Sequence, residues 1–129
     1  MPKKKILVVD DDIDLVEAMR LTLENAGFEV IDAQDGDRGF ELMKSEKPDL
    51  LILDIMMGTQ DEGFHVAYRI KSEEDISDIP IIMLTAVGQE TGFEFDKDKD
   101  EDFLPVNEFV EKPVDPEALV ELVRKNLGQ

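Results

Sequence analysis

The sequence predicts an α/β protein in which helices cover both faces of a five-stranded, doubly wound parallel sheet. Short runs rich in β-branched and apolar residues alternate with segments whose apolar residues recur at helical spacing, which is the pattern of such a sheet. Most of the runs are continuously apolar, as expected of strands buried on both faces. With 129 residues and no internal repeat, the chain fits one domain spanning residues 1–129.

The predicted strands are five short runs, each followed by a polar or charged residue. They occupy residues 5–9, 28–33, 50–53, 80–84 and 108–111. Because parallel strands need crossover connections, the segments between the runs are where helices are expected.

Four helices are predicted, three between strands and one after the last strand. The first ends before Gly27, which suits a helix C-terminus. Asp115 is the expected N-cap of the last helix and Pro116 its first residue. The apolar residues that mark the four helices at helical spacing are Leu15, Met19 and Leu23; Phe40 and Met43; Val66, Ala67 and Ile70; and Leu119, Leu122, Val123 and Leu127.

One segment departs from this alternation. Residues 88–105 hold seven acidic residues and two lysines and carry no helical apolar stripe. Low hydrophobicity and repeated aspartates favour a mobile loop or a frayed helix over a packed element. The fourth helix region of this sheet is therefore expected to be atypical.

Charge and composition exclude several function classes. Thirty-two acidic residues against 14 basic ones give a net charge of −18. That charge repels nucleic acid and anionic membranes, so neither direct nucleic-acid binding nor membrane insertion is expected. With no cysteine and His65 as the single histidine, the chain has no disulfide, thiolate metal site or His-pair metal site. The sequence shows no signal peptide and no membrane-spanning run, so we expect a cytoplasmic protein.

Polar side chains gather at the carboxyl ends of the predicted strands. Asp10 and Asp11 follow the first strand, Asp54 ends the third, Thr85 the fourth and Lys112 the fifth. Because these ends meet at one edge of a parallel sheet, we expect the five side chains to share a pocket. Three carboxylates so close repel one another, and a divalent cation would neutralise them. Oxygen ligands with room left for water suit Mg²⁺.

Four segments of the chain together resemble the receiver domain of bacterial two-component response regulators. They are residues 6–11, 51–54, 84–86 and 111–113, in that order and each at a strand end. The likeness covers nearly the whole chain and implies a flavodoxin-like (βα)5 fold. It also implies a module, similar to the stand-alone chemotaxis regulators, that takes a phosphoryl group from a sensor histidine kinase or a phosphotransfer protein. No turnover of an external substrate is expected.

The resemblance assigns roles around the pocket. Asp54 would be the residue that accepts the phosphoryl group. Asp11 and Asp54 would bind Mg²⁺ directly and Asp10 mainly through water, and the backbone carbonyl of Met56 would be a further ligand. Lys112 would pair with the phosphoryl oxygens.

The resemblance also implies a switch and a slow loss of phosphate. Thr85 would hydrogen-bond the phosphoryl group, and Phe109 would turn from exposed to buried as Thr85 moves. Met56 and Val87 would flank the phosphoryl group, and because both are apolar, neither orients an attacking water, so self-dephosphorylation is expected to be slow. Lys112 and Pro113 would be joined by a cis peptide bond.

Two segments depart from the family pattern. Residues 57–63 have glycine where the family usually has proline, and one extra residue, so the conformation of this loop is open. Residues 88–105 lack the usual fourth helix, in a region that forms part of the family's partner-binding face. The downstream target is therefore unknown from sequence.

Two other functions remain as alternatives. A haloacid-dehalogenase-like phosphatase would use Asp10 as its nucleophile, but the chain lacks the later acidic pair and the cap that this family needs. A receiver fold that serves only as an interaction module would not be phosphorylated at all. Since the sequence stops at Gln129, soon after the last predicted helix, we expect output through protein contacts, which could include a homodimer formed on phosphorylation.

Overall fold

The computed structural model describes residues 3–54, 62–85, 108–112 and 114–128. Its centre is one five-stranded sheet in the order β2-β1-β3-β4-β5, and every neighbouring pair of strands is parallel. The strands are β1 (Lys5–Val9), β2 (Glu29–Ala33), β3 (Leu50–Asp54), β4 (Ile81–Thr85) and β5 (Glu108–Glu111). The predicted parallel sheet is confirmed, and each strand boundary lies within one residue of the prediction.

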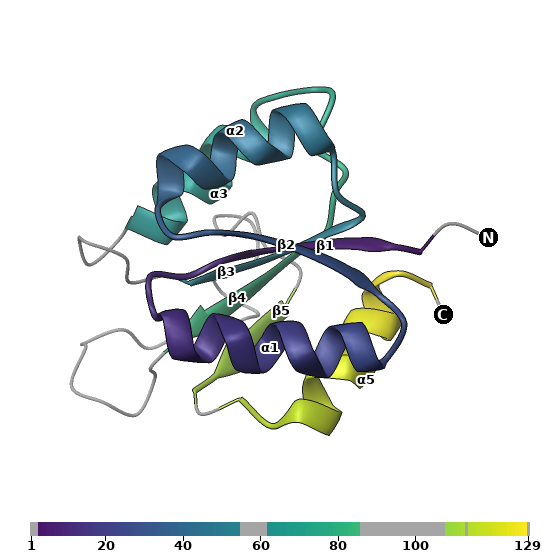
Figure 1. The fold of residues 1–129 in the computed structure, drawn as a ribbon. Coiled ribbons are helices and arrows are strands. Elements are labelled where there is room, and N and C mark those ends of the chain that lie inside the picture. The colour runs from purple at the N-terminus through teal and green to yellow at the C-terminus, as the bar shows by residue number, and fades with distance from the viewer. Residues whose placement is uncertain (1–2, 55–61, 86–107, 113, 129) are drawn as a thin grey trace.

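Helices cover both faces of this sheet (Figure 1). Two lie on one face and two on the other, with α2 packed beside α3 and α1 beside α5. They are α1 (Ile13–Asn25), α2 (Gly36–Glu46), α3 (Glu62–Lys71) and α5 (Pro116–Asn126). Each follows a strand and runs back over the sheet, so the helices begin at the edge where the strands end.

The core is divided by the sheet into two apolar clusters. Leu7, Val9, Leu51 and Leu53 point to the face covered by α2 and α3, and the alternate residues of the same strands point to the face of α1 and α5. Residues 6–9 of β1 and 50–53 of β3 are fully buried on both faces of the sheet, as their continuous apolar sequence predicts.

Three helices begin at an aspartate that caps them. The side chains of Asp12, Asp35 and Asp115 accept hydrogen bonds from the backbone N–H three residues further along, at the starts of α1, α2 and α5. Such caps satisfy backbone donors that a helix start leaves unpaired. The predicted end of the first helix is also confirmed, because Gly27 has a φ of 98°, a left-handed conformation that glycine adopts without strain.

Some sequence predictions need adjustment or are outside the described residues. Of the four apolar residues predicted to be buried in the last helix, Leu119 and Val123 are buried, whereas Leu122 and Leu127 are only partly buried against the same cluster. The loop predicted at residues 57–63 lies outside the described residues up to residue 61, and residues 62 and 63 begin α3. The predictions for residues 88–105 and for Pro113 fall outside the described residues. Among the described helices, none is long and apolar enough to span a membrane.

Candidate functional site

The site lies at the carboxyl edge of the sheet, where β1 and β3 end side by side. Val9 pairs with Leu53, so the next residue of each strand segment, Asp10 and Asp54, meets the other at this edge. The N–H of Asp10 donates to the carbonyl of Ala33 at 3.1 Å, which extends the β1–β2 pairing by one residue. The aspartates are therefore held by the sheet itself rather than by a loop.

Three carboxylates come together there. One carboxylate oxygen from each of Asp10, Asp11 and Asp54 lies within 4.8 Å of the other two. Asp10 and Asp54 are buried, with 0% and 3% of their surface exposed, and Asp11 is exposed. Burial raises the cost of this like-charge contact, because the effective dielectric constant in the interior is lower than in water.

Lys112, directly after β5, supplies a positive charge to this cluster. Its Nζ lies 3.3 Å from Oδ2 of Asp10 and 3.4 Å from Oδ1 of Asp54. The backbone of Lys112 is fixed by its N–H, which donates to the carbonyl of Thr85 at 2.8 Å and so continues the β4–β5 pairing. Burial lowers the pKa of Lys112, but the carboxylates of Asp54 and Asp10 outweigh it, and the pKa is raised above 10.5. The lysine is thus an ammonium ion at neutral pH.

The donor set fits a divalent cation. Oδ1 of Asp10 accepts the N–H of Asp12 at 2.9 Å, whereas the buried Oδ2 accepts no hydrogen bond from the described residues, although the Lys112 ammonium lies near it. A buried carboxylate oxygen without a hydrogen bond is costly unless another ligand satisfies it. Three carboxylates against one ammonium also leave negative charge to be neutralised. Oxygen donors of this kind suit Mg²⁺.

The structure places the other predicted site residues as follows. Thr85 is buried at the end of β4, one residue beyond Leu84, which pairs with Asp54. Phe109 is partly buried on β5 and packs against the apolar cluster on the α2 and α3 face. Met56 and Val87 lie outside the described residues.

Sequence reasoning brought Asp10, Asp11, Asp54 and Lys112 to one place, and the structure confirms that they meet. It did not anticipate that the ammonium would sit between two carboxylates, in direct contact with Asp10. Nor did it identify the backbone bonds from Asp12 to Asp10 and from Lys112 to Thr85. The N-cap position of Asp12 was the one available signal, because the turn into a helix often brings such a backbone N–H close to a preceding side chain.

Comparison with known proteins gives a consistent answer. A sequence model described as the response regulator receiver domain matches residues 6–124. The DNA-binding dual master transcriptional regulator RpaA of Synechocystis is 37% identical over 121 residues, which cover 93% of this chain and 47% of that protein. The phosphate regulon transcriptional regulatory protein PhoB of Pseudomonas aeruginosa is 38% identical over 125 residues, covering 93% of this chain and 50% of that protein. The chain thus spans about half the length of these curated relatives.

Solved structures agree in fold. The chemotaxis response regulator CheY4 of Vibrio cholerae superposes with a TM-score of 0.82 at 26% identity, over 97% of this chain and 99% of that one. The N-terminal domain of a response regulator receiver protein from Methanoculleus marisnigri gives a TM-score of 0.72 at 31% identity, over 97% of each chain.

Proposed function

Because this chain belongs to the response regulator receiver family of two-component systems, whose members are phosphorylated on an aspartate, we propose that Asp54 is the aspartate that accepts the phosphoryl group. One observation carries this assignment. Asp54 ends a central strand, contributes a carboxylate oxygen to the three-acid cluster and lies 3.4 Å from the Lys112 ammonium. A phosphoryl group on Asp54 would therefore be flanked by a cation site and by a fixed ammonium.

The proposed reaction is transfer from a phosphohistidine to the Asp54 carboxylate. A carboxylate oxygen of Asp54 forms a bond to phosphorus as the phosphorus–nitrogen bond breaks. The electron pair of that bond stays on the imidazole nitrogen, which takes up a proton, and Asp54 becomes an aspartyl phosphate. An ionised carboxylate is already a nucleophile, so the site needs no general base. Receiver domains generally do not turn over an external substrate, and none is proposed here.

The charges of the site are arranged for a loose, highly charged transition state, in which catalysis is mostly positioning and electrostatic stabilisation. Receiver domains typically use Mg²⁺. Asp11 and Asp54 would hold it directly, Asp10 through water, and the carbonyl of Met56 would complete the protein ligands. When bound, Mg²⁺ would neutralise and orient the phosphoryl oxygens. The Lys112 ammonium would exchange its contact with Asp54 for one with a phosphoryl oxygen.

Thr85 and Phe109 form the proposed switch. The buried position of Thr85, next along β4 from the residue that pairs with Asp54, supports a hydrogen bond from its hydroxyl to the phosphoryl group. Phe109 is only partly buried, so part of its side chain is still exposed and would be removed from solvent if it turned inward as Thr85 moved. Phosphorylation of Asp54 would in this way change which part of Phe109 is exposed on the surface at β5. We also propose that Met56 and Val87 flank the phosphoryl group and, being apolar, do not orient an attacking water, so that self-dephosphorylation is slow.

The proposed partners follow from this role. A sensor histidine kinase or a phosphotransfer protein supplies the phosphoryl group, and output passes through protein contacts, including a homodimer formed on phosphorylation. The DNA binding in the name of RpaA belongs to that whole protein, of which the matched part is 47%. Within the module of residues 1–129, we propose that the acidic surface does not contact nucleic acid directly.

The assignment is tested by intact mass spectrometry after incubation with acetyl phosphate and Mg²⁺. The wild type and Asp78→Asn, a control that removes an exposed carboxylate outside the site, should each gain the mass of one phosphoryl group. Asp54→Ala should gain none. A phosphoryl group that persists in Asp54→Ala would overturn the assignment. Its location on Asp10 would support the phosphatase alternative, and its absence from all three proteins would support a module that is not phosphorylated.

A further inference from the structure

Asp12 connects the acid cluster to the start of α1. Its backbone N–H donates to Oδ1 of Asp10 at 2.9 Å, and its own carboxylate accepts the N–H of Leu15 at 3.2 Å. The carbonyl of Asp12 also accepts the N–H of Val16 at 3.0 Å, as the first turn of a helix requires. One residue is therefore bonded to a buried acid of the cluster on one side and to the first turn of α1 on the other.

The connection between β1 and α1 is short, and the structure holds it at both ends. It consists of the three residues 10–12, because β1 ends at residue 9 and α1 begins at residue 13. Asp10 is held by its N–H, which donates to the carbonyl of Ala33 at 3.1 Å, and Asp12 is held by α1. Asp11 lies between them with an exposed side chain. The position of its carboxylate consequently depends on where α1 begins.

From these contacts we infer that Asp12 is a positioning residue for the metal site. As the N-cap of α1 it keeps Asp10 and Asp11 in the arrangement that binds Mg²⁺, without being a ligand itself. The inference rests on the Mg²⁺ ligands of the proposed function. A site whose ligands are ordered for only a fraction of the time binds its ion more weakly by that fraction. By linkage, Mg²⁺ should order the first turn of α1 in return.

Asp35 offers a matched control at the start of α2. Its carboxylate accepts the N–H of Arg38 at 2.8 Å, and its carbonyl accepts the N–H of Gly39 at 3.0 Å, so it caps α2 in the same way as Asp12 caps α1. Among the contacts of the described residues, none joins Asp35 to the three acids. Loss of either cap should weaken a helix start, but only the cap of α1 should change the affinity for Mg²⁺.

The first test measures the Mg²⁺ dissociation constant by isothermal titration calorimetry, with no phosphodonor present. The variants are Asp12→Ala, Asp12→Asn, Asp35→Ala and Asp35→Asn. Asparagine is as good an N-cap as aspartate and alanine is a poor one, while both are uncharged, so each pair isolates the cap from the charge. Asp12→Ala should bind Mg²⁺ about threefold more weakly than Asp12→Asn, within the effect of one N-cap. The two Asp35 variants should bind it equally.

The second test needs only the wild type, so it remains decisive if Asp12→Ala folds poorly. Amide hydrogen exchange is measured with and without Mg²⁺ at the four N–H groups that the two caps hold. Exchange at Leu15 and Val16 in α1 should slow when Mg²⁺ is added. Exchange at Arg38 and Gly39 in α2 should slow less, because their cap is not bonded to the acid cluster.

Three results would overturn the inference and leave Asp54 as the proposed acceptor. They are equal Mg²⁺ affinities of Asp12→Ala and Asp12→Asn, a loss of affinity in Asp35→Ala as large as that in Asp12→Ala, and equal slowing of exchange at the two helix starts. Failure of the wild type to bind Mg²⁺ at all would instead overturn the proposed metal site, and the inference with it. The calorimetry of the wild type therefore distinguishes the two kinds of failure.

Discussion

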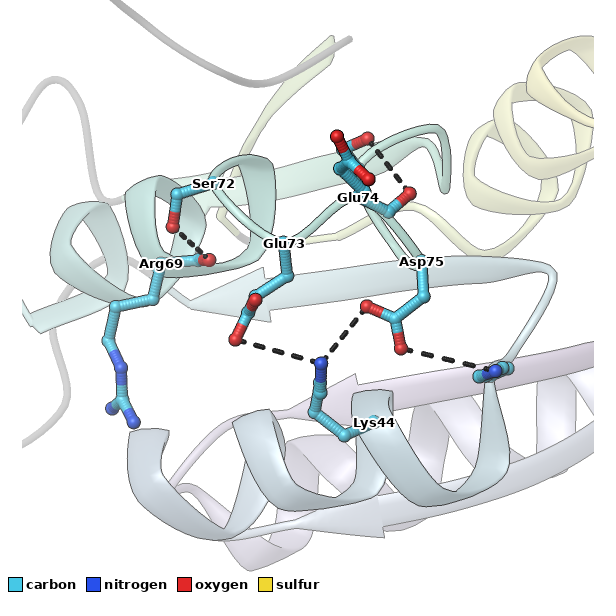
Figure 2. A network of polar contacts seen from close by, with 8 residues as sticks. Lys44, Arg69, Ser72, Glu73, Glu74 and Asp75 are labelled. Atoms are coloured by element: carbon cyan, nitrogen blue, oxygen red, sulfur yellow. Dashed lines mark hydrogen bonds and ion pairs between the residues drawn. The ribbon is translucent and has the colours of Figure 1, made fainter.

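Two clusters of charged side chains in this molecule use the same chemical groups in opposite ways. The acid pocket comprises Asp10, Asp11, Asp54 and Lys112. The surface network joins α2 to the segment that follows α3, as Figure 2 shows, and comprises Lys44, Lys47, Glu73 and Asp75.

The surface network is balanced and solvated. Nζ of Lys44 lies 3.0 Å from Asp75 and 3.6 Å from Glu73, and Nζ of Lys47 lies 3.9 Å from Asp75. Two cations face two anions, and their side chains are between 37% and 59% exposed. Ion pairs of this kind contribute little to stability, because water competes for each charge and two long side chains lose freedom.

The acid pocket is unbalanced and largely buried. Three carboxylates face one ammonium, and Asp10 and Asp54 are almost completely removed from solvent. Burial strengthens both the attraction to Lys112 and the repulsion among the acids. This difference shows that counting ion pairs does not reveal how strongly each cluster affects the protein, because burial and charge balance decide that effect. The acid pocket keeps an excess of negative charge that the sheet holds in place and that a bound cation could neutralise.

The largest effect is expected from removing the ammonium of the pocket. Lys112→Met should destabilise the protein by about 2 to 4 kcal/mol, because it leaves Asp10 and Asp54 buried without their cation. Urea unfolding without divalent cations measures this difference. Lys44→Met removes a lysine from the surface network and should change the unfolding midpoint far less. If the two variants were equally stable, the distinction between the clusters would be wrong.

A smaller effect of opposite sign is expected at Asp54. Asp54→Asn removes one of three repelling carboxylates, so without Mg²⁺ it should stabilise the protein by about 1 kcal/mol. The wild type should gain about 1.4 kcal/mol when Mg²⁺ exceeds its dissociation constant tenfold, and the variant should lose most of that gain. Thermal melts with and without Mg²⁺ measure both effects. Asp78→Asn, outside the pocket, should respond to Mg²⁺ like the wild type, and a full Mg²⁺ response in Asp54→Asn would contradict the ligand assignment.

The acid pocket could be predicted from sequence because its residues lie at the carboxyl ends of strands, and the sheet fixes the position of those ends. Asp10 follows a continuous apolar run, Asp54 ends another, and Lys112 ends the short run at β5. In a parallel sheet these positions lie at one edge, so their proximity can be predicted without knowing any side-chain contact. The prediction therefore needed only the strand pattern and the direction of the strands.

The surface network could not be predicted in this way. Lys44 meets Asp75 across 31 positions of sequence, and Arg20 of α1 pairs with Asp32 of β2 across 12. These partners depend on how a helix lies over its neighbours, which the apolar spacing does not specify. The same reason explains why the burial of Leu122 and Leu127 was overestimated from sequence. Helical spacing predicted that Leu122 in α5 and Leu127 directly after it face the core, but it could not show that they are only partly buried there.

The smallest effect is expected in the pH dependence of the free energy that the surface network contributes to stability. The hydrogen bond from the Lys44 ammonium holds the pKa of Asp75 below its usual value of 3.8. The contribution of this pair to the free energy of unfolding is therefore fully present above pH 3.8, and it is lost as the pH falls through the lower, folded-state pKa. Protonated Asp75 and asparagine are both uncharged, so the free energies of unfolding of the wild type and Asp75→Asn should become more similar in acid.

Urea unfolding of the wild type and Asp75→Asn between about pH 7 and pH 3 measures the convergence of the two midpoints. The difference at pH 7 should be small, because both partners are exposed, and should shrink further below pH 3.8. High salt at pH 7 should produce the same convergence by screening the pair. A difference that grew in acid would mean that folding favours the uncharged form of Asp75. That result would remove the contrast between a network balanced by its own charges and a pocket with an excess of carboxylates.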